Sequence, residues 1–338
     1  MPSDELVFRD YRPEDKATII DLLAGGRPGH YPDQKRAVFD WQFFANPRAA
    51  GRSPFIVGTV GDDIVAINGL MPVGARAGGQ PVAANWSLDT YVSGNYRGRG
   101  FGKSLIERVT ASAPVMLGFG ISDMSDPIFE KFKWQLDTSM ATMFFHANEV
   151  GLKGLSKNLL TRCSRSFRFQ KGRAAARFAL ETAPSHAELD KLWRDVLPHY
   201  PHAVERDGAY LIWRYRDAPV LRYRWVAARE NGQLRALLIT RHDPLESVIV
   251  DYVGPLDAPA LLLSLIDFAC SELVEMDTRR IRCEANHPEL LKALGAAGFR
   301  RYHTPGRFRV HAQPGVAFGP PAQWFVMTGD SDNDLFVL

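Results

Sequence analysis

The chain has 338 residues, of which 46% are hydrophobic, and this is enough apolar material for two domains with separate cores. A net charge of +3 is nearly neutral for this length and argues against a basic nucleic-acid-binding protein. The three cysteines, Cys163, Cys270 and Cys283, are too widely spaced for a disulfide framework or a metal cluster. We therefore expect reduced thiols, no bound metal and no nucleic-acid partner.

The N-terminal residues and the apolar runs bear on localisation. Residues 2–5 carry no basic segment followed by an apolar one, so no signal peptide is visible. No uninterrupted apolar run is long enough to cross a bilayer. We expect a cytoplasmic protein without a membrane span.

The first half alternates between short strands and helices. Aromatic and β-branched runs predict the strands, and the apolar pattern after a capping residue predicts the helices. A turn at Gly61-Asp62-Asp63 predicts a hairpin. The expected strands are 6–9, 55–59, 64–70, 81–92, 114–121 and 139–146, and the expected helices are 13–23, 39–44, 103–113 and 126–133. The strand 139–146 is expected to close this half.

A glycine-rich loop follows the strand that ends at Val92. It contains the pattern Arg97-x-x-Gly100-x-Gly102 and leads into a predicted helix. Glycines let backbone N–H groups converge on an anion, and the helix N-terminus adds favourable potential. The spacing does not fit a dinucleotide fingerprint, and Arg97 stands where a P-loop requires glycine. The loop therefore predicts a phosphate site of another kind.

This strand, loop and helix resemble the coenzyme A loop of the GNAT superfamily of acyl-CoA-dependent N-acyltransferases. Gly94 replaces the proline that usually precedes the loop. The order of elements over residues 5–147 is also similar to a GNAT domain. The resemblance implies coenzyme-binding roles for Tyr91, Val92, Arg97, Gly98, Arg99, Gly100, Phe101, Gly102, Lys103 and Ser104.

The second half repeats features of the first in the same order. Trp41-x-Phe43 recurs as Trp213-x-Tyr215, and Tyr91-Val92 recurs as Tyr252-Val253. The fold expected is α/β (mixed α+β), with two tandem GNAT-like domains, each a twisted mixed sheet flanked by helices. The boundaries expected are 1–150 for the domain with the acyl-CoA loop, 151–177 for a basic linker, and 178–338 for a degenerate GNAT-like domain.

The second copy and the linker differ from the first copy in charge. After Val253 the loop contains Pro255, Asp257 and Pro259, which remove N–H donors and repel phosphate. We expect this half not to bind coenzyme. The stretch 153–177 is rich in Lys and Arg and has no acid. It is either a solvated linker or a contact for an anionic partner.

Two positions bear on catalysis. Asp89, on the strand before the loop, could act as base for an acceptor amine or could be a structural carboxylate. Phe129 occupies the position where GNAT enzymes carry the tyrosine that protonates the leaving thiolate, and phenylalanine cannot donate a proton. Water or another residue could take this role, and His30, Tyr31 and His146 are possible substitutes.

The resemblance implies an N-acyltransferase that moves an acyl group, most simply acetyl, from acetyl-CoA or another acyl-CoA to an amine. The alternative is a catalytically silent acyl-CoA-binding or scaffold protein of a biosynthetic complex, which Phe129 favours. The ending 329–334 resembles the magnesium motif of haloacid-dehalogenase-like phosphatases, but no early Asp-x-Asp accompanies it. The ending 324–334 is also similar to GNAT-like proteins of bacterial polysaccharide loci, which implies a small-molecule or saccharide acceptor such as an amino sugar.

Overall fold

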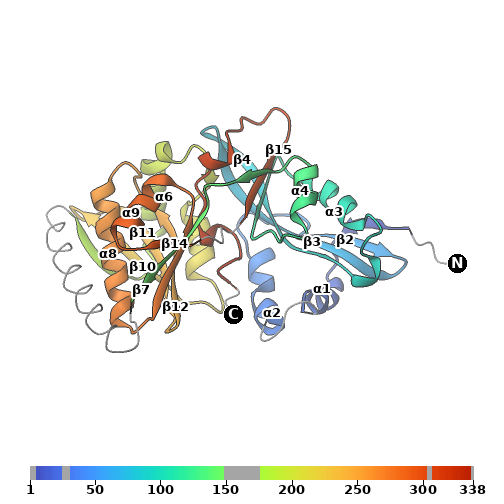
Figure 1. Cartoon of the computed structure of the whole chain (residues 1–338), viewed down its shortest axis with the longest axis horizontal. Coiled ribbons are helices and arrows are strands. Elements are labelled where there is room, and N and C mark those ends of the chain that lie inside the picture. Colours follow the sequence, from blue (N-terminus) through green and yellow to red (C-terminus); the bar gives the residue numbers. More distant parts are fainter. Residues whose placement is uncertain (1–4, 25–30, 148–175, 303–306, 336–338) are drawn as a thin grey trace.

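The computed structural model describes residues 5–24, 31–147, 176–302 and 307–335. Over these residues the strands form one eight-stranded and one seven-stranded mixed sheet, each flanked by helices. The two sheets form two lobes that lie side by side (Figure 1). The predicted fold class is confirmed.

The first sheet carries the predicted coenzyme loop. Its neighbouring strands, in spatial order, are β1 (Val7–Asp10), β2 (Phe55–Val60), β3 (Asp63–Ala77), β4 (Gln80–Val92), β5 (Val115–Phe119), β15 (Phe308–Ala312) and β6 (Gln135–Asp137), and β9 (Ala203–Val204) pairs with β3. Its helices are α1 (Asp15–Ala24), α2 (Tyr31–Phe43), α3 (Phe101–Thr110) and α4 (Asp126–Lys131), with a 3-10 turn η1 (Gly94–Tyr96). The parallel pair β4–β5 is the one that borders the loop.

The second sheet has the order β8 (Arg177–Glu181), β10 (Tyr223–Glu230), β11 (Gln233–Arg241), β12 (Glu246–Val253), β13 (Arg280–Ala285), β7 (Ala141–His146) and β14 (Arg300–Tyr302). Its helices are α6 (His186–Val196), α7 (Gly208–Leu211), α8 (Pro259–Glu275) and α9 (Pro288–Ala296). Short helical turns complete it: η2 (Leu197–His199), η3 (Ile212–Arg216), η4 (Pro321–Gln323) and η5 (Thr328–Asp330).

The two sheets have the same strand order, and each half of the chain contributes one strand to the sheet of the other half. β15 comes from the second half and lies between β5 and β6, while β7 comes from the first half and lies between β13 and β14. The expectation that strand 139–146 closes the first half is therefore wrong. The strand is present but pairs with the other sheet, because a short apolar strand carries no local signal of its partner.

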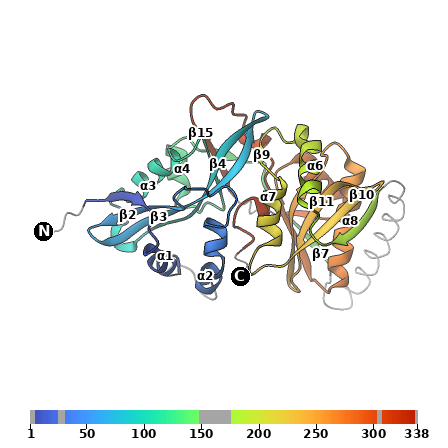
Figure 2. The same ribbon diagram turned by 180° about the vertical axis from the view of Figure 1, so that it is seen from behind.

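Contacts between the halves are reciprocal. The rings of Trp41 and Trp213 stack with centroids 5.1 Å apart. The indole N–H of Trp41 donates to the Trp213 carbonyl at 2.9 Å, and that of Trp213 donates to the Trp41 carbonyl at 3.0 Å. Equivalent residues that contact each other in both directions indicate a two-fold relation between the halves. Figure 2 shows α2 and α7 facing each other at this boundary.

The first sheet is covered on both faces. Alternate residues of β2 point to opposite sides, so Phe55 and Val57 pack on α1 and α2 while Ile56 packs on the side of α3. Strand β3 continues past the predicted end at 70 to Ala77, through Pro72, and forms a long hairpin with β4. This hairpin extends towards the second lobe, where β9 pairs with it.

Several sequence expectations have a defined outcome here. The predicted hairpin at Gly61-Asp62-Asp63 is confirmed, since β2 and β3 pair on either side of it. Asn231-Gly232, with φ of 51° and 80°, forms the matching turn between β10 and β11. Cys270 and Cys283 are buried. Cys163 and His30 lie outside the described residues, as does the basic stretch up to residue 175. No helix among the described residues is long and apolar enough to cross a membrane.

Candidate active site

The candidate site lies where β4 and β5 separate. The two strands pair only from Ala84 with Val115 to Trp86 with Leu117. Beyond that point β4 runs on to Val92 and β5 ends at Phe119. Backbone groups on the facing edges beyond Trp86 are left without a ladder partner from the opposite strand, which is an arrangement that suits a ligand.

An open glycine loop lies at one end of this gap. Gly98 and Gly100 have φ of +78° and +86°, and a Cβ at either position would meet no described atom within 4 Å. Gly100 caps α3 without a side-chain bond, and the first helical bond runs from the Ser104 N–H to the Gly100 carbonyl. The N–H groups of the first turn therefore point out of the helix end, where an anion can bind.

A cavity of about 410 Å³, here called the outer cavity, adjoins this loop. Most of the residues predicted to bind coenzyme line it: Tyr91, Val92, Arg97, Gly98, Gly100, Gly102 and Lys103. The other three lie beside it. Arg99 stacks on the Tyr96 ring at 5.1 Å, Phe101 packs against the same ring, and Ser104 lies one turn into α3.

The outer cavity has two cationic groups, and β4 holds one of them, Arg97. The Arg97 Nε–H donates to the Val92 carbonyl at 3.1 Å, and the guanidinium lies 5.9 Å from the centre of the Tyr91 ring. Lys103 adds a second positive charge from the first turn of α3. Two cations, open glycines and a helix N-terminus fit a diphosphate.

The equivalent loop of the second half is filled. A Cβ at Gly254 would collide with the Tyr252 hydroxyl. That hydroxyl donates to the Pro255 carbonyl at 3.0 Å, and the Tyr200 hydroxyl donates to the Gly254 carbonyl at 2.8 Å. Tyrosine side chains thus pack against the backbone directly after β12, whereas a Cβ at Gly98 or Gly100 would meet no described atom within 4 Å.

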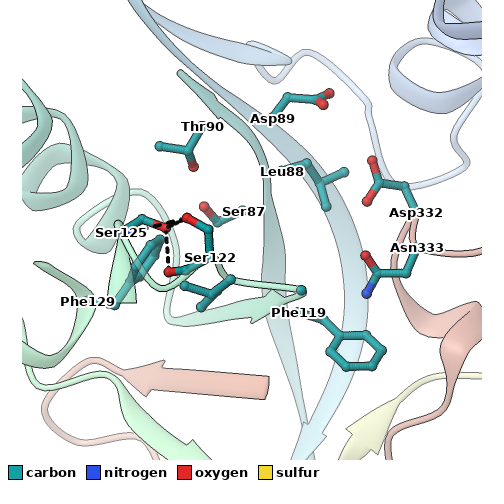
Figure 3. Close-up of a pocket in the computed structure, with 12 residues that line it drawn as sticks. Ser87, Leu88, Asp89, Thr90, Phe119, Ser122, Ser125, Phe129, Asp332 and Asn333 are labelled. Carbon is teal, nitrogen blue, oxygen red and sulfur yellow. Dashed lines mark hydrogen bonds between the residues drawn. The ribbon is translucent and has the colours of Figure 1, made fainter. Parts of the chain in front are cut away.

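A second cavity of about 280 Å³, the inner cavity, continues from the outer one (Figure 3). Thr90, Ser122 and Ser125 line both cavities. The inner cavity is also lined by Ser87, Leu88, Asp89, Phe119, Gly120, Ile121, Phe129, Asp332 and Asn333. Most of these side chains are polar, so the inner cavity suits a polar group better than a long alkyl chain.

Asp89 lies on a bulge of β4. Its φ is +52°, and the β3–β4 register shifts between Ile67 and Gly69, opposite this point. The Asp89 carboxylate forms an ion pair with the Lys35 ammonium from α2, and both side chains are buried. Figure 3 shows Asp89 and Thr90 on opposite sides of the strand. The predicted base is therefore at the cavity, but it has a cation as partner.

Lys35 is fixed by further contacts on α2. Its ammonium donates to Gln42 Oε1 at 3.0 Å and lies 5.1 Å from the centre of the Phe43 ring. The second half repeats the pair, since Arg206 donates to Asp251 at 3.0 Å beside a bulge in β12. In both halves a buried cation forms an ion pair with a carboxylate on a bulged strand. Lys35 lies before β2 and pairs with β4, and Arg206 lies before β10 and pairs with β12.

Asn68 of β3 organises two hydroxyls of the inner cavity. Its Oδ1 accepts from Ser87 at 2.9 Å and from Thr90 at 2.6 Å. Asn68 is fully buried, and its Nδ2–H donates to the Gly69 carbonyl at 2.7 Å. This residue escaped the sequence analysis because a single Asn in an apolar strand has no motif.

The C-terminal segment 329–335 brings Asp332 and Asn333 to the inner cavity. Arg206 holds Asp330 at 2.7 Å, and Arg214 pairs with Asp334, all four side chains being buried. Figure 3 shows Asp332 and Asn333 across the cavity from Ser122 and Ser125. The acidic ending that resembles a phosphatase motif thus serves to attach this segment. No cluster of three or more His, Cys, Asp or Glu residues able to hold a metal occurs in the described ranges.

Strand β15 positions the other wall. Arg309 donates to Asp126 at 2.6 and 3.0 Å and to the Trp134 carbonyl at 2.6 Å. The hydrogen bonds from the Arg309 guanidinium lower the pKa of Asp126. Asp126 begins α4, directly after Ser125. The exchanged strand therefore fixes the helix that borders both cavities.

The structure places Phe129 at the inner cavity, and places one of the three candidate proton donors, His146, away from both cavities. Phe129 is buried, packs edge-on against Trp134 at 4.8 Å and lines the inner cavity. His146 is exposed at the end of β7 in the other sheet and lines neither cavity. His30 lies outside the described residues, and the side chain of Tyr31 is not among those described.

Solved structures, but not sequence comparisons, show similarity to this chain. No protein-family model and no curated protein matches this sequence. A GCN5-related N-acetyltransferase from Anabaena variabilis superposes with a TM-score of 0.63 at 12% identity, covering 91% of this chain and 73% of that one. The chain has the GNAT fold. A second such protein from Kribbella flavida superposes with a TM-score of 0.58 at 14% identity, over 91% and 71% of the two chains.

The GNAT fold also links this chain to a longer-chain acyltransferase. The N-myristoyltransferase of Saccharomyces cerevisiae, solved with bound myristoyl-CoA, superposes with a TM-score of 0.56 at 12% identity. The match covers 91% of this chain and 84% of that one. All these similarities extend over both lobes, so the pair of sheets is shared and not only the lobe with the loop.

Proposed function

We propose that this protein is an acyl-CoA-dependent N-acyltransferase. The observation that carries the proposal is the open, cationic glycine loop at the start of α3, which lines the outer of two connected cavities. The loop residues would hold the diphosphate of the coenzyme. The bound acyl-CoA would supply an activated thioester, and the unpaired edge of β4 beyond Trp86 offers backbone N–H groups to its carbonyl oxygen.

The inner cavity bears on the substrates. Its volume of about 280 Å³ and its polar lining favour a short acyl group, most simply acetyl, and a polar amine acceptor such as an amino sugar. In the transfer, the acceptor nitrogen bonds to the carbonyl carbon and the carbon–sulfur bond breaks. Asp89 would take the amine proton directly or through one water. Asp332 and Asn333 would contact the acceptor from the second wall.

The strand order supports a tandem duplication as the origin of this chain. Apart from β9, each strand of the first sheet has a counterpart at the same place in the second, including the exchanged pair β7 and β15. We infer that both halves descend from one ancestral domain. We propose the domain boundaries 1–150 and 178–338, with 151–177 as the linker. Each domain then contributes one strand, β7 or β15, to the sheet of the other.

The first experiment measures coenzyme binding. Isothermal titration with acetyl-CoA should detect binding to the wild type. Arg97→Ala should weaken it about 10- to 100-fold, because a charged hydrogen bond contributes about 1.5–3 kcal/mol. Arg108→Ala is the matched control, since Arg108 lies on α3 over the Phe8 ring and away from the cavity. Absence of binding to the wild type would exclude the proposal.

The second experiment separates an enzyme from a silent binder. Thiol release from acetyl-CoA is followed with glucosamine and other amino sugars as acceptors. Acceptor-dependent release supports the transferase. Tight binding with no release for any amine would favour the scaffold alternative, for which the lack of a hydroxyl on Phe129 is the structural argument.

A further inference from the structure

The junction of the two cavities is rich in hydroxyl groups. Thr90, Ser122 and Ser125 are the residues that line both cavities. If the diphosphate lies at the loop and the acyl group lies in the inner cavity, the thioester between them lies at this junction. A thiolate that leaves there needs a hydrogen-bond donor, and the neighbouring Phe129 has none.

The hydroxyls of β4 already have an acceptor. Thr90 and Ser87 both donate to Asn68 Oδ1, at 2.6 and 2.9 Å. Each hydroxyl has a single proton. Their protons are therefore directed at Asn68, inside the sheet, and not at the junction.

The two serines on the other wall share a bond in which one proton is left over. Ser122 Oγ and Ser125 Oγ are 2.8 Å apart. When Ser122 donates to Ser125, the Ser125 proton can turn to the Ser122 carbonyl at 3.2 Å or to a ligand at the junction. Figure 3 shows this pair facing Thr90 across the opening. Ser122 is exposed, so its hydroxyl can exchange protons with water.

We infer that Ser125, supported by Ser122, is the group that hydrogen-bonds to the thioester sulfur and protonates the leaving thiolate. The inference rests on the proposed function. As the carbon–sulfur bond breaks, its electron pair goes to sulfur, which takes the Ser125 hydroxyl proton. Ser125 regains a proton from Ser122, and Ser122 regains one from water. The proton released by the amine returns to solvent through the base on the β4 side.

The test uses binding and titration before activity. Free coenzyme A is titrated in complex with the protein, and the ultraviolet absorbance of its thiolate gives the pKa of the bound thiol. A hydrogen bond to the thiolate lowers that pKa. Ser125→Ala should therefore raise it by about one to two pH units relative to wild type. Ser125→Thr should restore the wild-type value because the hydroxyl is kept.

Controls separate this role from a structural one. Ser125 is the N-cap residue of α4 but makes no side-chain capping bond, so the alanine variant keeps the helix. Ser112→Ala removes a hydroxyl that donates to the Val109 carbonyl, away from both cavities, and should leave the thiol pKa unchanged. Ser122→Ala should raise the thiol pKa less than Ser125→Ala, because it removes only the support of the donor.

Activity gives an independent readout. With the thioester S-acetyl-N-acetylcysteamine as donor and hydroxylamine as acceptor, Ser125→Ala should slow acetyl transfer about tenfold or more. With S-acetyl thiophenol as donor the variant should slow transfer much less, because thiophenolate leaves without needing a proton. Equal thiol titration in wild type and Ser125→Ala would overturn the inference and leave the proposed function intact. Failure of the wild type to bind coenzyme A would overturn both.

Discussion

Gly100→Ala tests whether the loop conformation itself holds the coenzyme. Gly100 has φ of +86°, and its added Cβ would meet no described atom within 4 Å. The cost is therefore backbone strain alone, about 1–2 kcal/mol for a non-glycine residue in the left-handed region. If binding requires the loop in this conformation and the free loop relaxes, acetyl-CoA affinity should fall about 5- to 30-fold. Isothermal titration measures the affinity, and urea unfolding measures the stability.

Two other glycines provide matched controls. Gly61, in the β2–β3 turn, also has positive φ, at +57°, and open space around its Cβ. Gly61→Ala should lose about 1–2 kcal/mol of unfolding free energy and keep the wild-type affinity for acetyl-CoA. Gly94 has open space and no positive φ, so Gly94→Ala should change neither. The reasoning is refuted if Gly100→Ala binds acetyl-CoA as tightly as Gly61→Ala does.

Two further variants test the links between the halves. Asp126→Asn weakens the bond to Arg309, which lowers the pKa of Asp126. That bond contributes stability above the ordinary carboxylate pKa of about 3.9, and the contribution is lost as the pH falls through the lower folded-state pKa. The variant should therefore lose less stability than wild type as the pH falls below about 5, which acid titration of the unfolding free energy measures. Trp213→Phe leaves the Trp41 carbonyl without its 3.0 Å donor and should cost about 1–3 kcal/mol in urea unfolding, while acetyl-CoA affinity is unchanged; an equal loss of affinity would contradict a purely structural contact.

Local patterns in the sequence were enough for most elements and for the loop. The glycines and Arg97 mark a strand–loop–helix unit because each acts within a few residues. The exchange of β7 and β15 could not be predicted, because both are short strands and neither carries a local signal for the sheet that it joins. The choice is made by contacts such as Arg309 with Asp126, which are remote in sequence.

The inner cavity was predicted least well for the same reason. Asn68, Ser122 and Ser125 belong to no motif and act only after β3, β4 and α4 come together. One signal for Lys35 was present in the sequence. Lys35 and Arg206 are spaced almost as Trp41 and Trp213 are, so the internal repeat could have indicated that both cations have the same partner.

The pairing of Asp89 with Lys35 changes how its catalytic role must be tested. Asp89→Asn removes the base but also leaves a buried ammonium without its counter-charge, which should cost roughly 3–5 kcal/mol of stability. Loss of turnover in this variant alone would not separate catalysis from misfolding.

The double variant Lys35→Met/Asp89→Asn removes both charges and should be more stable than the Asp89→Asn single variant in urea unfolding, because no unpaired charge stays buried. If Asp89 is the base, the double variant should bind acetyl-CoA like wild type and still turn over about 10²- to 10⁴-fold more slowly. Lys35→Met alone is the remaining corner of the cycle, since it keeps the carboxylate and removes its partner. Wild-type turnover in a folded double variant would mean that the Asp89 carboxylate serves the bulge of β4, as Asp251 serves that of β12, and that the base is another group at the inner cavity.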